Sequence, residues 1–162
     1  MSPVKPIPDN YGTVTPYLII KDAAKAVEFY KKVFGAEEVF RMPMPDGSIM
    51  HAEIRVGNSR LMMTDEGCAL GAKSPMALGG APVSFYLYVA DADATYNLAL
   101  KEGGTVIRAI EDRFYGDRVG MIRDPFGHVW SVATHIEDVP KDELMRRAQD
   151  MQKKMGNEGE KK

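Results

Sequence analysis

The sequence predicts an α+β fold in which one βαβββ unit occurs twice. The first observation is an internal repeat: a shift of 69 positions places identical residues on one another at several positions between 17 and 47, without a gap over that span. The second is that each copy shows the same order of strand-like and helix-like patterns. Two copies are too few for a solenoid, so we expect one pseudo-symmetric domain. The identical pairs include Tyr17/Tyr86, Leu18/Leu87, Asp22/Asp91, Ala23/Ala92, Lys32/Lys101, Gly35/Gly104 and Gly47/Gly116.

The first module, residues 13–66, begins with a strand rich in β-branched and aromatic residues. Asp22 is expected to cap the following helix, and Gly35 to end it in a left-handed conformation. Three strands follow, and Gly57-Asn58 fits a two-residue hairpin between the last two. The predicted strands lie at about 13–20, 37–42, 49–56 and 59–65.

The second module, residues 82–135, repeats this order with Asp91 as the helix cap and Gly103-Gly104 as the stop. Each helix can cover only one face of its four-stranded sheet. The other face must therefore meet a second sheet or a ligand. The predicted strands lie at about 83–89, 106–111, 118–123 and 129–135.

Three further segments complete the predicted organisation. Residues 1–12 form an N-terminal arm. The glycine-rich linker 67–81 is long for a structureless connection, which predicts a binding loop or lid. Residues 136–162 contain a C-terminal helix and tail. The helix carries an apolar stripe that must dock on the body or on a partner chain, formed by Leu144, Ala148, Met151 and Met155.

Composition narrows the function classes. The chain has 162 residues, 44% hydrophobic and 27% charged, which is typical of a globular domain with a sizeable core. No apolar run is long enough to span a membrane, and no signal segment is visible. The single cysteine, Cys68, predicts no disulfide and a cytoplasmic location. The net charge of −2 argues against nucleic-acid and membrane partners and leaves a small molecule as the expected partner.

Four segments carry a resemblance to a known family: 14–22 (VTPYLIIKD), 50–53 (MHAE), 114–118 (FYGDR) and 124–130 (DPFGHVW). With the double βαβββ unit, they resemble the PhnB-like branch of the vicinal oxygen chelate superfamily. That superfamily includes glyoxalase I, the bleomycin- and fosfomycin-resistance proteins and the extradiol dioxygenases. The resemblance, which covers residues 13–135, implies sheets curled into half-cups, helices outside and the ligand inside. It also implies a homodimer, often with each cup shared between two chains.

Strand alternation predicts which side chains line the cup. Trp130 and Val132 are expected to pack on the helix of their module, which turns their neighbours on the last strand to the other face. Three tyrosines on the cup side suit a flat, partly apolar organic ligand, although each tyrosine could instead pack between sheets. The predicted ligand-binding residues are Tyr17, Met62, Thr64, Ser84, Tyr86, Tyr88, Ser131 and His135.

The resemblance also implies where a metal would be held. The four symmetric ligand places fall on Thr15, Met62, Ser84 and Ser131. Zinc, iron and nickel prefer imidazole, thiolate or carboxylate donors, which none of these residues offers. We therefore expect no metal cofactor at the usual site, and no glyoxalase I, fosfomycin-transferase or dioxygenase chemistry there.

His51 and Glu53, two residues apart on one strand, can point toward the same place. One hypothesis makes them the general base and acid of a lyase or isomerase, with or without a displaced divalent metal. The alternative, which we favour, is a polar wall in which they bond to each other and to Thr64. His135 and Glu66 occupy pseudo-symmetric positions at the ends of the last strands.

Two turn segments receive structural interpretations. His128, in the Asp-Pro-Phe-Gly-His turn, is expected to face solvent. Tyr115, Asp117 and Arg118 could reach a ligand at the cup rim, but we favour a turn with an Asp117–Arg118 ion pair. Two function classes remain: a metal-independent protein that binds a small organic molecule, and an enzyme of the lyase or isomerase type.

Overall fold

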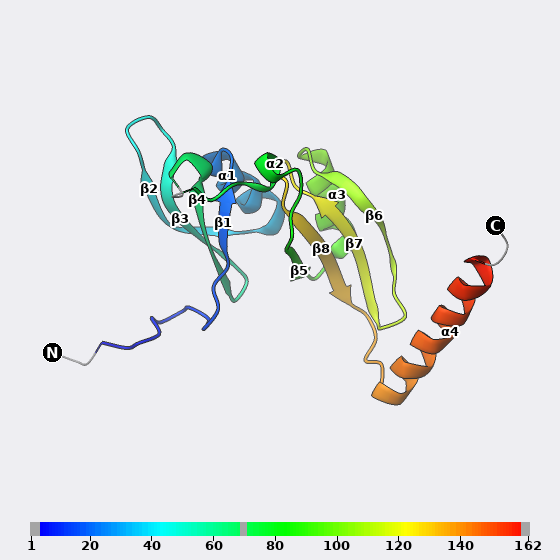
Figure 1. The fold of residues 1–162 in the computed structure, drawn as a ribbon. Helices are drawn as coiled ribbons and strands as arrows, with labels where there is room; N and C mark the ends of the chain where they lie inside the picture. The colour runs from blue at the N-terminus through cyan, green and yellow to red at the C-terminus, as the bar shows by residue number, and fades with distance from the viewer. Residues whose placement is uncertain (1–3, 69–70, 160–162) are drawn as a thin grey trace.

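The computed structural model describes residues 4–68 and 71–159 and contains two four-stranded sheets, each with one long helix (Figure 1). This confirms the predicted α+β class with two βαβββ modules. The first module consists of β1 (Tyr17–Ile20), α1 (Ala23–Phe34), β2 (Glu37–Pro43), β3 (Ile49–Val56) and β4 (Ser59–Asp65). The second consists of β5 (Ser84–Tyr88), α3 (Ala92–Lys101), β6 (Thr105–Asp112), β7 (Asp117–Arg123) and β8 (Val129–His135).

Both sheets have the same topology. Their strand orders are β1-β4-β3-β2 and β5-β8-β7-β6, with one parallel pair in each, β1 with β4 and β5 with β8. Tyr17 lies opposite Met62 in the first parallel pair, and Tyr86 lies opposite Ser131 in the second. Tyr86 lies 69 positions after Tyr17, and Ser131 lies 69 positions after Met62. The sequence repeat is therefore also a repeat of strand register.

The long helices begin in the same way in both modules. Asp22 caps α1 and Asp91 caps α3, each by accepting from a backbone amide of the first turn. A residue at the end of the last strand supports each cap. Asp65 accepts from the amide of Ala23 at 2.9 Å, and Thr134, 69 residues later, accepts from the amide of Ala92 at 2.8 Å. The last strand of each module is thereby tied to the start of its helix.

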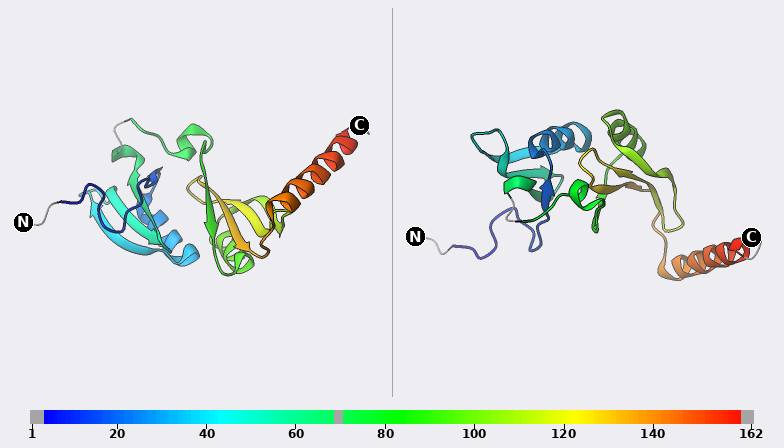
Figure 2. Two further views of the ribbon diagram at one scale, coloured as in Figure 1. Left: turned by 90° about the horizontal axis from the view of Figure 1, so that it is seen from below. Right: turned by 45° about the horizontal axis from the view of Figure 1, so that its top comes forward.

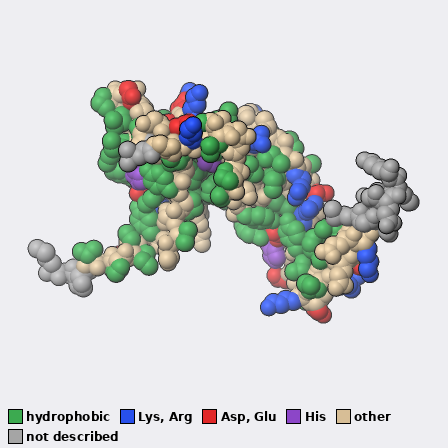
Figure 3. Space-filling view, in the orientation of Figure 1, with side chains coloured by type: hydrophobic (Ala, Val, Ile, Leu, Met, Phe, Trp, Pro, Cys, Tyr) green, Lys and Arg blue, Asp and Glu red, His purple; other side chains and the backbone are tan. Residues whose placement is uncertain are grey.

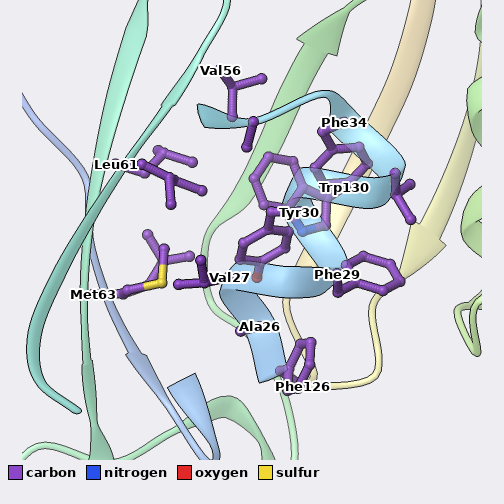
Figure 4. Packing of buried hydrophobic residues seen from close by; sticks show 14 of the residues in the cluster. Ala26, Val27, Phe29, Tyr30, Phe34, Val56, Leu61, Met63, Phe126 and Trp130 are labelled. Carbon is purple, nitrogen blue, oxygen red and sulfur yellow. The ribbon is translucent and has the colours of Figure 1, made fainter. Parts of the chain in front are cut away.

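One core joins the two modules (Figure 4). Trp130 and Val132 are buried, as strand alternation predicts. Trp130 on β8 packs against α1 of the other module, with ring centroids 5.4 Å from Tyr30 and 4.7 Å from Phe34. Helix α1 therefore covers its own sheet on one side and meets the second module on the other.

The segment between the modules contains more regular structure than predicted. A 3-10 turn spans Glu66–Cys68, and a short helix, α2, spans Pro75–Leu78. Ser74 caps α2, because its hydroxyl accepts from the amide of Ala77 and donates to Glu66 Oε2 at 2.7 Å. Part of the linker is therefore regular structure, while Ala69 and Leu70 lie outside the described part.

The last helix, α4 (Lys141–Gly159), extends away from both sheets (Figures 1 and 2). Arg147 anchors its first half by ion pairing with Glu137 and donating to the carbonyl of Phe114 at 3.2 Å. Leu144 and Ala148 of the predicted stripe are half-buried, whereas Met151 is exposed. The side chain of Met155 lies outside the described residues. No helix in the described part of the chain is long and apolar enough to cross a membrane.

Candidate ligand-binding site

The outward face of the second sheet carries exposed aromatic rings. Phe85 and Leu87 of β5 pack against the core, so Tyr86 and Tyr88 lie on the opposite face. They are 46% and 60% exposed, with ring centroids 5.1 Å apart. Figure 3 shows hydrophobic side chains gathered over both modules on the face turned to the viewer. Two adjacent, accessible aromatic rings are typical of a surface that takes an apolar ligand.

A buried carboxylate holds these tyrosines in place. Asp117 is 3% exposed, and its Oδ2 accepts from the hydroxyls of Tyr86 at 2.9 Å and Tyr88 at 2.8 Å. Its Oδ1 lies 2.8 Å from His135 Nδ1, and His135 Nε2 lies 3.0 Å from Asp138. The predicted ion pair between Asp117 and Arg118 is therefore wrong. Arg118 points to the other face of β7 and pairs with Asp93 and Asp112.

The protonation states follow from these contacts. Burial alone would raise the pKa of Asp117, but hydrogen bonds from His135, Tyr88 and Tyr86 outweigh it and lower the pKa. Hydrogen bonds to Asp117 and Asp138 raise the pKa of His135. Burial, together with Tyr115 and Asp117, raises the pKa of Tyr86, and the bond to Asp117 raises that of Tyr88. Both phenols therefore stay protonated and act as donors to an ionised carboxylate.

A row of side chains crosses the second sheet on this face. Tyr86 lies opposite Ser131, Ser131 opposite Met121, and Met121 opposite Arg108. These four residues line a hollow of about 270 Å³ together with Ser84, Tyr115, Val119 and Gly120. Ser131 is buried at its floor, whereas Ser84 and Arg108 are exposed.

The equivalent row of the first sheet contains Tyr17, Met62, Glu53 and Phe40. His51 Nε2 lies 3.1 Å from Glu53 Oε1, which confirms that these two side chains meet. The ring of His51 stacks on Tyr17 with centroids 5.7 Å apart, and the Tyr17 hydroxyl lies 3.4 Å from His51 Nδ1.

Glu53 has more hydrogen-bond and ion-pair partners than the sequence indicates. It is 8% exposed and pairs with Arg60 at 2.8 Å, and Tyr11 of the N-terminal arm donates its hydroxyl proton to it. Burial would raise the pKa of Glu53, but hydrogen bonds from Tyr11, His51 and Arg60 outweigh it and lower the pKa. A carboxylate held ionised by three donors is a poor general acid.

Sequence reasoning missed several partners of these carboxylates. Arg60 shares the strand parity of Met62, which is a signal that could have placed it on this face. Tyr11 belongs to an irregular arm and carries no periodic signal. Thr64, expected to bond to the pair, is instead buried and donates to the carbonyl of Ile49 at 3.3 Å. The polar wall therefore exists with Arg60 and Tyr11 in place of Thr64.

Two further predicted positions differ from expectation. His128 is 7% exposed rather than solvent-facing, because Pro75 and Met76 of α2 lie against its turn at Gly127. Burial lowers its pKa. Glu66, the pseudo-symmetric counterpart of His135, accepts from Ser74 in the linker and does not join the polar row of the first sheet.

The four usual metal places do not fit a transition metal. Thr15, Ser84 and Ser131 offer neutral hydroxyls and Met62 a thioether, and the Thr15 hydroxyl already donates to the carbonyl of Gly12 at 3.2 Å. Among the side chains that the structure describes, no group of three or more His, Cys, Asp and Glu could hold a metal ion. His51 and Glu53 supply only two such donors.

Comparison with known proteins identifies the family to which this architecture belongs. A family model described as "Glyoxalase/Bleomycin resistance protein/Dioxygenase superfamily" matches residues 12–132. The uncharacterised protein Rv0887c of Mycobacterium tuberculosis is 42% identical over 134 residues, which cover 81% of this chain and 79% of that protein.

Solved structures show the same fold. Protein PA1353 of Pseudomonas aeruginosa matches with a TM-score of 0.64 and 26% identity, over 76% of this chain and 98% of that one. A PhnB protein of Bacillus cereus matches with a TM-score of 0.61 and 16% identity, over 76% of this chain and 99% of that one. The chain therefore belongs to the glyoxalase/bleomycin resistance protein/dioxygenase superfamily.

Proposed function

We propose that this protein binds a small organic molecule against the tyrosine-lined face of the second sheet, without a metal at the four usual places. The observation that carries the proposal is the arrangement of Tyr86 and Tyr88, whose rings are exposed while Asp117 fixes their hydroxyls. A rigid aromatic wall loses little conformational entropy when a ligand packs on it. This favours binding of a flat, partly apolar molecule.

The first sheet supplies the second half of the cup and combines the polar group of His51, Glu53 and Arg60 with apolar side chains. Its outward face exposes Tyr17, Phe40 and Met42 beside the half-buried Met62. Apolar groups of this size are normally covered by a ligand or another protein surface. We propose that the protein is a homodimer in which a first sheet of one chain faces a second sheet of the other.

The experiment is a thermal-shift screen of aromatic antibiotics and short hydroxy-ketones, followed by titration of each compound that stabilises the protein. Tyr86→Ala and Tyr88→Ala should weaken binding, whereas Tyr86→Phe should retain most of it because the ring remains. Met76→Ala is a control, because Met76 is equally exposed but lies on α2. Ligands that bind Tyr86→Ala and Tyr88→Ala as tightly as the wild type would refute the proposal.

The second candidate function is that of a lyase or isomerase that uses His51. The observation that favours it is the 3.1 Å contact with Glu53, because a carboxylate that orients an imidazole is a common arrangement for a general base. Glu53 would then position His51 rather than act as the acid. The test is turnover of the hydroxy-ketones, with and without added divalent metal. His51→Gln should abolish it and Glu53→Gln should reduce it; turnover unchanged by His51→Gln would exclude this function.

A further inference from the structure

The outward face of the second sheet holds a cation that is not neutralised by the residues around it. Arg108 is exposed on β6 and ends the cross-strand row that starts at Tyr86. The acidic residues on and beside this strand have other partners. Glu111 pairs with Arg113, Asp112 with Arg118, and Asp117 with His135.

No carboxylate among residues 4–68 and 71–154 forms an ion pair with the Arg108 guanidinium, and Glu111, Asp112 and Asp117 each have another partner. The first sheet differs in this respect, because its charged row residue, Glu53, is neutralised by Arg60. In the described part of the first sheet, the row equivalent to that of Arg108 thus carries no unpaired cation.

Neutral hydroxyl groups accompany this cation. The hollow of about 270 Å³ is lined by Arg108 together with the side chains of Ser84, Tyr115 and Ser131. A guanidinium presents parallel N–H donors that match the two oxygens of a carboxylate, and hydroxyls can donate to the same oxygens. At the other end of the row, the ring of Tyr86 offers an apolar surface beside Tyr88.

We propose that the ligand is an aromatic or other flat organic acid whose carboxylate is bound by Arg108, while its apolar body packs on Tyr86 and Tyr88. This inference rests on the proposed binding function and adds the chemical class of the ligand. It requires one anionic group at one end of the molecule, because the hollow offers a single guanidinium.

The test compares 2-naphthoate with its uncharged isostere 2-naphthamide by fluorescence titration of the full-length protein. The wild type should bind the carboxylate roughly tenfold more tightly or better, as expected for charged hydrogen bonds. Arg108→Gln should remove this preference, and Arg108→Lys should restore part of it. Lys101→Gln is the matched control, because it removes one positive charge from α3 and should leave the preference unchanged.

Each other outcome overturns the inference. Equal binding of both probes, weakened by Tyr86→Ala, would refute the carboxylate site and leave the proposed binding function standing. If neither probe nor any compound of the aromatic screen binds, the carboxylate site and the proposed binding function are both refuted. If Arg108→Gln weakens self-association without changing naphthoate binding, the anion opposite Arg108 is a protein carboxylate of a second chain. Thermal melts verify that the variants fold. We expect the Arg108 variants to fold, because Arg108 is exposed.

Discussion

The phenol of Tyr30 donates a 2.7 Å hydrogen bond to the carboxylate of Asp124, which lies 94 residues later in the other module. Asp124 also accepts from the indole of Trp130 at 2.9 Å and from the backbone amides of Phe126 and His128. The side chains of Tyr30 and Asp124 are both buried. Burial raises the pKa of Tyr30, so its hydroxyl remains a donor. The joint between the modules is therefore a satisfied polar cluster inside aromatic packing.

Trp130→Ala should lower the free energy of unfolding by about 3–5 kcal/mol, as expected for a buried aromatic residue. Tyr86→Ala and Tyr88→Ala should each cost well below that range, because their rings face solvent and Asp117 keeps its remaining donors. Denaturant melts of the three variants measure the difference. Equal losses for the tyrosine and tryptophan variants would show that the face assignment is wrong.

Glu53→Ala should cost about 1–3 kcal/mol of stability, because it leaves Arg60 without its carboxylate. The Arg60 side chain is only 13% exposed, so water cannot fully replace the lost partner. The double variant Glu53→Gln/Arg60→Gln should lose less free energy of unfolding than the sum of the losses of Glu53→Gln and Arg60→Gln. The comparison is a double-mutant cycle in urea, and additive losses would argue against the pair.

Two histidines should give opposite pH dependences of stability. Burial lowers the pKa of His128 from 6.5, so its contribution is lost as pH falls below 6.5 toward the folded-state value. Hydrogen bonds raise the pKa of His135 from 6.5, so its contribution is full below 6.5 and is lost as pH rises through the folded-state value.

Urea midpoints of the variants measured across this range separate the two contributions. His128→Gln should flatten the acidic side of the profile, and His135→Gln should flatten the part above 6.5. A His135→Gln profile that keeps the wild-type slope above 6.5 would contradict the role of the Asp117–His135 contact.

Protein purified without chelator should carry far less than one divalent ion per chain, because the usual places hold three hydroxyls and a thioether. EDTA should leave the melting temperature unchanged. Elemental analysis checks the first point and calorimetry the second. Stoichiometric metal that is lost in Met62→Ala would refute this expectation, whereas metal lost only in His51→Gln would reveal a displaced site.

Truncation after Pro140 should weaken the proposed dimer, because Met151 of the α4 stripe is exposed in the single chain. Met151→Glu should have a similar effect, while Gln149→Glu adds the same charge on another face of the helix and should not. Light scattering over a range of protein concentrations measures the association. A wild type that is monomeric at micromolar concentration would exclude the dimer.

The sequence alone determined the strands, the long helices and the faces of the strands, because these depend on local patterns. Helix caps act within one turn, and side chains alternate at every residue of a strand. The 69-residue repeat then transferred each assignment from one module to the other, as the equal registers of Tyr17 and Tyr86 show.

The local contacts of the two helix caps and of His51 with Glu53 could be predicted, but only the tertiary structure decided which polar groups meet across the fold. Asp117 and Arg118 are adjacent in β7, so their side chains point to opposite faces and find partners on β5, β8 and α3. Tyr11 reaches Glu53 across 42 residues, and helix α2 of the linker lies against the turn that holds the buried His128. Such contacts depend on how the modules, arm and linker pack in space, which no local period of the sequence encodes.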